Sequence, residues 1–371
     1  MQSALRRLWM KRALLLAAVP PVYAWSSPGL PRYPAVYPRT LSFPRDFGAH
    51  PEYRTEWWYM TGWLGQGTDA MGFQVTFFRS RTLHPDDNPS RFAPRQLMFA
   101  HAALALPAEG KLRHAEIAGR VGPAGASFET TDMALQLSGW SLRRTENDRY
   151  KVLIPAEDFR LELEAIPEQA PVLRGTEGYS LKGSSPELAS YYYSRPQLKV
   201  SAQVVLKSLS EKPRSSEQRL RLSGSAWFDH EWSSSLLMTG AVGWDWCGIN
   251  LLDGSSLMAF RIRDAGGQTL FSEWDWRDAQ GRVIASVPDV LWEPIGQWRS
   301  PRSLVTYPAS FELRTGGRTW TLRPLMADQE VDARASTGGF YYEGAVELIE
   351  NGKVMGRGYL ELTGYGAPLA L

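Results

Sequence analysis

The feature that most constrains the fold is an alternation of apolar and polar residues with a period of two. It recurs in well-separated segments: "GFQVTFFR" (72–79), "MALQLSGW" (133–140) and "RLELEA" (160–165). Successive side chains of a strand point to opposite faces, so this pattern is typical of strands with one buried face. Turn-forming pairs separate such runs: Asn147-Asp148, Gly266-Gly267, Gly316-Gly317 and Asn351-Gly352. We therefore predict an all-β chain of hairpins, in which closure into barrels removes the sheet edges.

An internal similarity indicates that the β unit is duplicated. After a shift of 187 positions, residues 57–75 align with residues 244–262 without a gap. The matched pairs include Trp57 with Trp244, Tyr59 with Trp246, Met71 with Met258 and Phe73 with Phe260. The alternative is a chance coincidence of two strand patterns. Because 371 residues exceed a typical single core, we predict an N-terminal barrel over 46–222 and a C-terminal barrel over 223–371. The boundary follows the polar run 208–219, which has the composition of a loop.

The first 24 residues are predicted to be an export signal. Four basic residues within 6–12 precede the apolar run "ALLLAAV" (13–19) and a small-residue cleavage pattern at 22–24. The sequence "RRLWMK" is typical of a twin-arginine signal. The general secretory route and an uncleaved anchor are the alternatives, although the apolar run is too short for a stable membrane span. The expected location is periplasmic or secreted, and residues 25–45, rich in proline, are expected to form an extended arm.

Charge and cysteine content exclude several classes of function. Without residues 1–24 the balance changes from 41 basic and 39 acidic residues to 37 and 39. No basic stripe for nucleic acid is present. Cys247 is the single cysteine, so no intramolecular disulfide and no cysteine pair for a metal can form.

Common catalytic signatures are also missing. The chain has no Gly-x-Ser-x-Gly elbow and no glycine-rich phosphate loop. His230-Glu231 begins like a zinc-protease motif, but position 234 is Ser. The five histidines show no metal-ligand spacing. We therefore predict neither a metal nor a cofactor.

What remains is a combination of aromatic and acidic residues in three stretches. These are "TEWWYMTGW" (55–63), "AWFDHEWSS" (226–234) and "GWDWCGINLLDG" (243–254). In a strand, the second stretch places Trp227, Asp229 and Glu231 on one face and Phe228, His230 and Trp232 on the other. In the first, Trp57 and Tyr59 share the face that repeats and are expected in a barrel core. Trp58, on the opposite face beside Glu56, is expected at a cavity or an interface.

A carboxylic acid in an aromatic pocket can act as a general acid. Desolvation raises the pKa of a buried carboxylic acid, so that it can donate a proton near neutrality, and aromatic faces stabilise positive charge. The catalytic candidates are Asp229, His230, Glu231, Asp253 and Glu56, and the ligand-lining candidates are Trp58, Tyr59, Trp232, Trp244, Trp246 and His101. The alternatives are structural. The tryptophans are then core residues, Glu56 pairs with Arg54 or another base, Asp253 belongs to an Asp-Gly turn, and His101 is a core histidine.

Several motifs in order resemble the AttH-like, or carotenoid 1,2-hydratase-related, lipocalin-like proteins. They include "HPEYRTEWWYMTGWL", "FAHAAL", "YYYSRPQLKV", "WFDHEWSS" and "GWDWCGINLLDGSSLMAFR", between His50 and the C-terminal "GYGAPL". The resemblance implies two tandem lipocalin-like (calycin) β-barrels. It also implies cofactor-free hydration in one branch, with an Asp as proton donor, and exported proteins called secreted hydrolases in another. The chain resembles the second branch more, because of its predicted export signal. His230 and Trp232 match a His-x-Trp element of the hydratases. Leu251-Leu252-Asp253 is the nearest match to their aromatic-x-Asp element and lacks the aromatic residue.

Two functions follow as expectations. The first is an exported protein that binds an apolar, lipid- or isoprenoid-like ligand and acts on it as a hydratase or hydrolase around Asp229 and His230. The second is a non-catalytic periplasmic carrier or accessory protein of a lipid or lipoprotein ABC transporter. Burial of Asp229, His230 and Glu231 in one apolar cavity would favour the enzyme.

Overall fold

The computed structural model describes residues 32–369 except 86, 91, 123–124, 209–216, 236 and 288–289. The predicted export signal and the start of the proline-rich arm lie outside these residues. The helical segments in the described part are two 3-10 turns, η1 (Arg45–Phe47) and η2 (Gly67–Asp69), and the remaining regular structure is β. The all-β prediction is therefore confirmed. None of the described helices is long and apolar enough to cross a membrane.

The first sheet curls into a nearly closed barrel. Its strands are β1 (Thr55–Leu64), β2 (Met71–Arg81), β3 (Gln96–Leu106), β4 (Lys111–Arg120), β5 (Ala126–Phe128), β6 (Ala134–Leu137), β7 (Trp140–Arg144), β8 (Tyr150–Pro155), β9 (Phe159–Ile166), β10 (Val172–Leu173), β11 (Tyr179–Leu181), β12 (Ala189–Leu206) and β13 (Gln218–Ser233). The main order is β4-β3-β2-β1-β13-β12-β9-β8-β7-β6-β5, and β10 and β11 pair with β12. The edge strand β4 contacts β6, which brings the two ends of the sheet together.

The second sheet is smaller. It contains β14 (Ala241–Leu251), β15 (Ser256–Asp264), β16 (Thr269–Arg277), β17 (Val283–Val287), β18 (Leu291–Arg299), β19 (Thr306–Thr315), β20 (Arg318–Pro324), β21 (Glu330–Ala333), β22 (Gly339–Glu350) and β23 (Lys353–Leu362). The order is β17-β16-β15-β14-β23-β22-β20-β19-β18, with β21 on β22. The consecutive strands β17 and β18 thus form the two ends of this sheet.

The internal similarity falls on equivalent parts of the two sheets. Residues 57–75 cover β1 and the start of β2, and residues 244–262 cover β14 and β15. Each first strand pairs with the last strand of its own sheet, β1 with β13 and β14 with β23. Residues 218–224, expected near the boundary, instead begin β13 and pair with β12. The chain passes to the second sheet only after Ser233, because the strands on either side of the polar run, β12 and β13, both belong to the first sheet.

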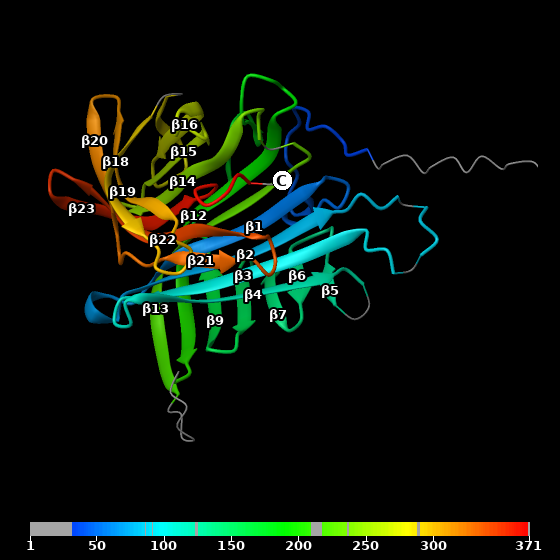
Figure 1. The fold of residues 1–371 in the computed structure, drawn as a ribbon, viewed down its shortest axis with the longest axis horizontal. Coiled ribbons are helices and arrows are strands. Elements are labelled where there is room, and N and C mark those ends of the chain that lie inside the picture. The colour runs from blue at the N-terminus through cyan, green and yellow to red at the C-terminus, as the bar shows by residue number, and fades with distance from the viewer. Residues whose placement is uncertain are drawn as a thin grey trace, which may run out of the picture.

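The two sheets pack against each other, with β22 and β23 lying beside β1 and β2 (Figure 1). One face of β1 contributes Trp58 and Met60 to the core of the first barrel, and the other contributes Tyr59 and Trp63 to the apolar layer between the sheets. The expectation that Tyr59 lies in a barrel core and Trp58 at a cavity or interface is therefore reversed. Both faces of β1 are buried, so alternation alone does not tell which face points into the barrel.

The proline-rich arm lies against the first barrel where it is described. Val36 and Leu41 of the arm, and Phe47 of the following turn η1, are buried in the core of this barrel. The Tyr191 hydroxyl donates a hydrogen bond to the carbonyl oxygen of Tyr37 at 2.8 Å. The arm continues through η1 and brings His50 to the interior of the barrel, where this residue is 1% exposed.

Candidate functional site

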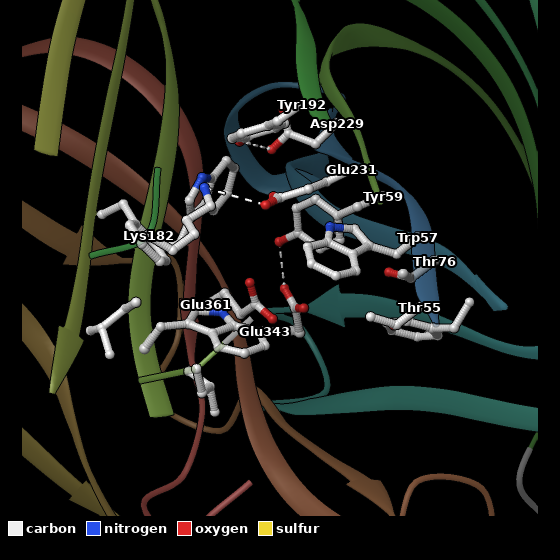
Figure 2. A pocket seen from close by; sticks show the side chains of 16 residues that line it. Thr55, Trp57, Tyr59, Thr76, Lys182, Tyr192, Asp229, Glu231, Glu343 and Glu361 are labelled. Atoms are coloured by element: carbon white, nitrogen blue, oxygen red, sulfur yellow. Dashed lines mark hydrogen bonds and ion pairs between the residues drawn. The ribbon is translucent and has the colours of Figure 1, made fainter. Parts of the chain in front are cut away.

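A cavity of about 110 Å³ lies between the two sheets. Strands of both sheets contribute to its wall, because the outward faces of β1 and β13 meet those of β14, β15, β22 and β23 there. The wall consists of aromatic, aliphatic and carboxylic side chains with two threonines and one lysine: Thr55, Trp57, Tyr59, Thr76, Phe78, Lys182, Tyr192, Asp229, Glu231, Leu237, Trp244, Trp246, Phe260, Ile262, Glu343 and Glu361 (Figure 2). The expected lining residues Tyr59, Trp244 and Trp246 are among them.

Asp229 reaches this cavity from the outward face of β13. Its Oδ2 accepts a hydrogen bond from the Tyr192 hydroxyl at 2.8 Å, and its Oδ1 accepts bonds from Ser194 Oγ and, at 2.8 Å, from Trp227 Nε1. Burial raises the pKa of Asp229 to about 6, although nearby Arg174 and the three donors favour the ionised form. Asp229 therefore exchanges its proton close to neutral pH.

Glu231 faces the same cavity two residues further along β13. Its Oε1 lies 3.3 Å from Lys182 Nζ, but the geometry is not that of a hydrogen bond. The Lys182 ammonium also lies 4.7 Å from the centre of the Tyr192 ring. Lys182 thus carries the positive charge on this side of the cavity.

Glu343 and Glu361 face Asp229 and Glu231 from the second sheet, and sequence reasoning missed both. They stand directly opposite each other on β22 and β23, and Tyr59 donates a hydrogen bond to Glu343 Oε2 at 2.8 Å. Burial, and then the charge of Glu361, raises the pKa of Glu343 well above its usual range. Burial also raises the pKa of Glu361 to about 7. The alternation of "YYEGAVELIE" and "YLEL" places each glutamate in an apolar strand, which was the available signal.

An ion pair between the sheets lies beside the cavity. Arg174 of the first sheet binds both carboxylate oxygens of Asp275 in β16, at 2.6 and 2.7 Å. Arg174 Nε also donates to Ser194 Oγ at 2.8 Å, and Ser194 in turn contacts Asp229. This pair connects the position of Asp229 to the second sheet.

His230 and Glu56 lie on the other side of β13 and β1, inside the first barrel. The predicted separation of Asp229 and Glu231 from His230 and Trp232 is confirmed by the side-chain contacts. His230 Nε2 lies 2.9 Å from Glu56 Oε1, and burial lowers the pKa of His230 to about 4 despite that carboxylate. The structure thus corrects the idea that Asp229 and His230 act together. His230, Glu56, Trp58 and Trp232 do not line the cavity.

The environment of Glu56 is a compensated charge cluster. Its Oε2 accepts a bond from Arg79 Nε at 2.8 Å, and its Oε1 lies 2.8 Å from His50 Nδ1. Glu56 is thus paired with Arg79 rather than Arg54. Burial alone would raise the pKa of Glu56, but Arg79 and His50 hold it well below its usual range. His50 Nε2 lies 3.0 Å from Asp46 Oδ1, so both ring nitrogens face carboxylates. Burial opposes charge on His50, but the two carboxylates raise its pKa, and we assign it as the imidazolium.

The same cluster is the one group among the described residues whose atoms are spaced for a metal. Ligand atoms of His50, Glu56 and His230 lie within 4.8 Å of one another. Glu56, however, already accepts bonds from Arg79 and from the backbone N–H of His50, at 2.8 and 2.9 Å. A cation here would meet Arg79 and the charged His50, so these residues fit an ion-pair network better than a metal centre.

His101 and Asp253 also lie outside the cavity wall. His101 Nδ1 and Nε2 lie 2.6 Å from the Tyr341 hydroxyl and 2.7 Å from Ser336 Oγ. Burial, with a contribution from His114, lowers the pKa of His101 to about 3, as for a neutral core histidine. Asp253 is exposed in the β14–β15 turn, where its Oδ1 accepts a bond from the Ser255 N–H at 2.9 Å. Neither residue approaches the acids described above.

The two packed sheets and the aromatic cavity between them define a lipocalin-like, two-barrel protein. Residues 34–365 match the family model described as AttH-like. The chain therefore belongs to the AttH-like family. No curated protein matches it.

Two solved structures resemble the chain over most of its length. A candidate AttH protein from Nitrosomonas europaea is 43% identical, with a TM-score of 0.80, and the match covers 90% of this chain and 100% of that one. Kievitone hydratase from Nectria haematococca is 15% identical, with a TM-score of 0.62, and the match covers 91% of this chain and 99% of that one. At this identity the second likeness concerns the fold alone. The predicted two-barrel lipocalin-like class is thereby confirmed.

Proposed function

We propose that this protein is exported, binds an apolar, lipid- or isoprenoid-like ligand between its two sheets and adds water to a carbon–carbon double bond of that ligand. The observation that carries the proposal is Asp229, a buried acid with a pKa of about 6, in a cavity whose wall includes seven aromatic side chains among sixteen residues. Among the described lining residues there is no Ser, Cys or His. Burial raises the pKa of Tyr59 and Tyr192 well above the usual range, so the carboxyl groups are the best-placed proton donors near neutral pH. The name of the structural neighbour kievitone hydratase supports a reaction of the same class.

The proposed reaction balances without a cofactor. Protonated Asp229 donates its proton to one carbon of the double bond, and positive charge develops on the other carbon. Trp57, Trp244 and Trp246 line the cavity, and their aromatic rings would stabilise that charge. A water oxygen then bonds to the cationic carbon, and the water proton returns to the Asp229 carboxylate.

Substitution of Asp229 by Asn tests this role. The protein is incubated with a mixture of unsaturated isoprenoid lipids, and native mass spectrometry detects bound ligand and products heavier by one water. We expect Asp229→Asn to retain ligand and to lose turnover by roughly 10²- to 10⁴-fold, the usual contribution of a general acid. Since the acid must hold its proton, wild-type turnover should fall as the pH rises through about 6.

Two results would contradict the proposal. Unchanged turnover in Asp229→Asn would exclude Asp229 as the acid. Ligand that is bound but never converted by the wild-type protein would instead favour a carrier or an accessory protein of a lipid or lipoprotein ABC transporter. The matched control is Asp253→Asn, which removes a carboxylate from an exposed turn.

A further inference from the structure

The cavity holds more carboxyl groups than cations. Asp229, Glu231, Glu343 and Glu361 are in its wall, and Lys182 is the one basic residue among the described lining residues. Lys182 is paired with Glu231. Like charges directly opposite on neighbouring strands destabilise a sheet, yet Glu343 and Glu361 occupy such positions. In the described part of the chain, neither of them forms an ion pair with a basic side chain.

The walls beside these glutamates are suited to positive charge. The faces of aromatic rings attract cations, and cages of several rings are used to bind quaternary ammonium groups. Trp57, Trp244 and Trp246 belong to this wall. Lys182 already uses the same interaction, since its Nζ lies 4.7 Å from the centre of the Tyr192 ring and 4.9 Å from that of Phe260.

Two buried polar atoms of the wall have unmet hydrogen-bonding capacity. Trp246 Nε1 donates no hydrogen bond, and Glu231 Oε1 accepts none, to or from the residues that the structure describes. Trp246 is 5% exposed and Glu231 is 6% exposed. Buried polar groups are normally bonded, so these two atoms are available to bond a molecule held in the cavity.

We propose that the ligand of this cavity carries a positively charged nitrogen, an ammonium or quaternary ammonium group, beside its apolar part. The nitrogen lies against the Glu343 and Glu361 carboxyl groups and the indole faces. A hydroxyl or ether oxygen next to it accepts the Trp246 N–H. This inference rests on the proposed function in one respect, namely that the ligand binds between the sheets.

Proton release accompanies this binding. In the empty cavity, Glu343 and Glu361 hold protons near neutrality because burial raises their pKa values. A cation favours the ionised carboxylates, so a proton passes from the glutamate pair to the buffer. The titratable groups that interact with the pair are Tyr59, Tyr341, Tyr359, Asp229, Glu231 and Asp245. Of these, Asp229, with a pKa of about 6, ionises in the same range.

Choline and its neutral isostere 3,3-dimethylbutan-1-ol provide the test. They share shape and a hydroxyl group, and differ in the charge on the central atom of the head group. Binding to the full-length protein is measured at pH 6.5 by titration calorimetry, in two buffers of different ionisation enthalpy. We expect choline to bind at least roughly tenfold tighter than the alcohol, equivalent to about 1.4 kcal/mol, and to release protons where the alcohol releases none.

The variant Glu343→Gln/Glu361→Gln should abolish both the preference and the proton release, while binding of the alcohol is retained. Retained binding of the alcohol also shows that the variant is folded. Asp253→Asn, with the same type of charge change outside the cavity, should leave all three quantities unchanged. Equal affinity of the wild-type protein for both probes, or an undiminished preference in the double variant, would overturn the inference. These are binding measurements, so a failure of the proposed hydration leaves them interpretable.

Discussion

The buried acids on the two sides of the paired strands β1 and β13 are in opposite states of compensation. On the inner face, His230 contacts Glu56, which is also bound by Arg79 and His50. On the outer face, Asp229 and Glu231 share a cavity with Glu343 and Glu361, and Lys182 is the one base in its wall. The pKa of Glu56 is lowered, and those of Asp229, Glu343 and Glu361 are raised.

The difference separates a structural cluster from a candidate site. Removal of one partner from a compensated buried cluster leaves a charge without solvation, which destabilises the fold. An uncompensated set of acids is already unfavourable, and such groups persist mainly where they serve a ligand or a reaction. Substitutions on the two faces should therefore change stability in opposite directions.

The largest expected effect is that of Arg79→Met. Methionine keeps an apolar stem but removes the guanidinium, which also donates to the carbonyl oxygens of His50 and Tyr53 at 3.0 Å. Arg79 and Glu56 are both 0% exposed. We expect a loss of roughly 3–5 kcal/mol in the free energy of unfolding, measured by urea denaturation at pH 7. The control Arg160→Met breaks an exposed pair with Glu162 and should change stability by at most about 1 kcal/mol. Equal effects of the two substitutions would show that the inner cluster is not the compensated unit described here.

The outer face should respond with the opposite sign. A carboxyl group whose pKa is raised in the folded state binds more protons there than in the unfolded chain, so its contribution to stability decreases as the pH rises from about 4.5 through about 7. Glu361→Gln removes this term. We expect the variant to be more stable than wild type by roughly 1–3 kcal/mol at pH 8 and to show little gain at pH 5.

The measurement for Glu361→Gln is thermal and urea unfolding at the two pH values. The matched control is Glu164→Gln, whose carboxylate pairs with Arg149 at the surface. Because that pair lowers the pKa of Glu164, its removal should not stabilise the protein at pH 8. A Glu361→Gln variant that is destabilised at pH 8 would mean that an unrecognised cation compensates the glutamate pair.

Much of the architecture could be predicted from local sequence, because period-two alternation and turn pairs depend on neighbouring residues. The internal similarity between 57–75 and 244–262 falls on the first two strands of each sheet. The division of Asp229 and Glu231 from His230 and Trp232 followed from strand geometry alone. Strand geometry did not predict which face points into the barrel, because both sides of β1 and β13 are buried.

The sequence predicted only those residues of the candidate site that lie in the aromatic and acidic stretches of the chain. Asp229, Glu231, Trp244 and Trp246 lie in conspicuous aromatic stretches, whereas Glu343 and Glu361 lie in ordinary strands. Glu343 and Glu361 lie near Asp229 only because the two sheets pack together, and no local sequence pattern indicates that packing. Lys182 is likewise brought to Glu231 from a separate segment of the chain. The surplus of carboxyl groups over basic residues is a property of the assembled cavity.

The smallest expected effect is that of Asp253→Asn. This substitution tests whether the catalytic acid lies in the cavity or at the position that the family resemblance implies. The nearest match to the aromatic-x-Asp element of the hydratases ends at Asp253, which lies in the exposed β14–β15 turn and bonds to Ser255. An Asn side chain can keep its oxygen in the same place, so Asp253→Asn should change the free energy of unfolding by no more than about 0.5 kcal/mol and leave turnover unaltered. Urea unfolding and the lipid-conversion assay measure the two quantities. A loss of turnover comparable to that of Asp229→Asn would place the reacting carboxyl at the turn and would leave the cavity between the sheets without its catalytic acid.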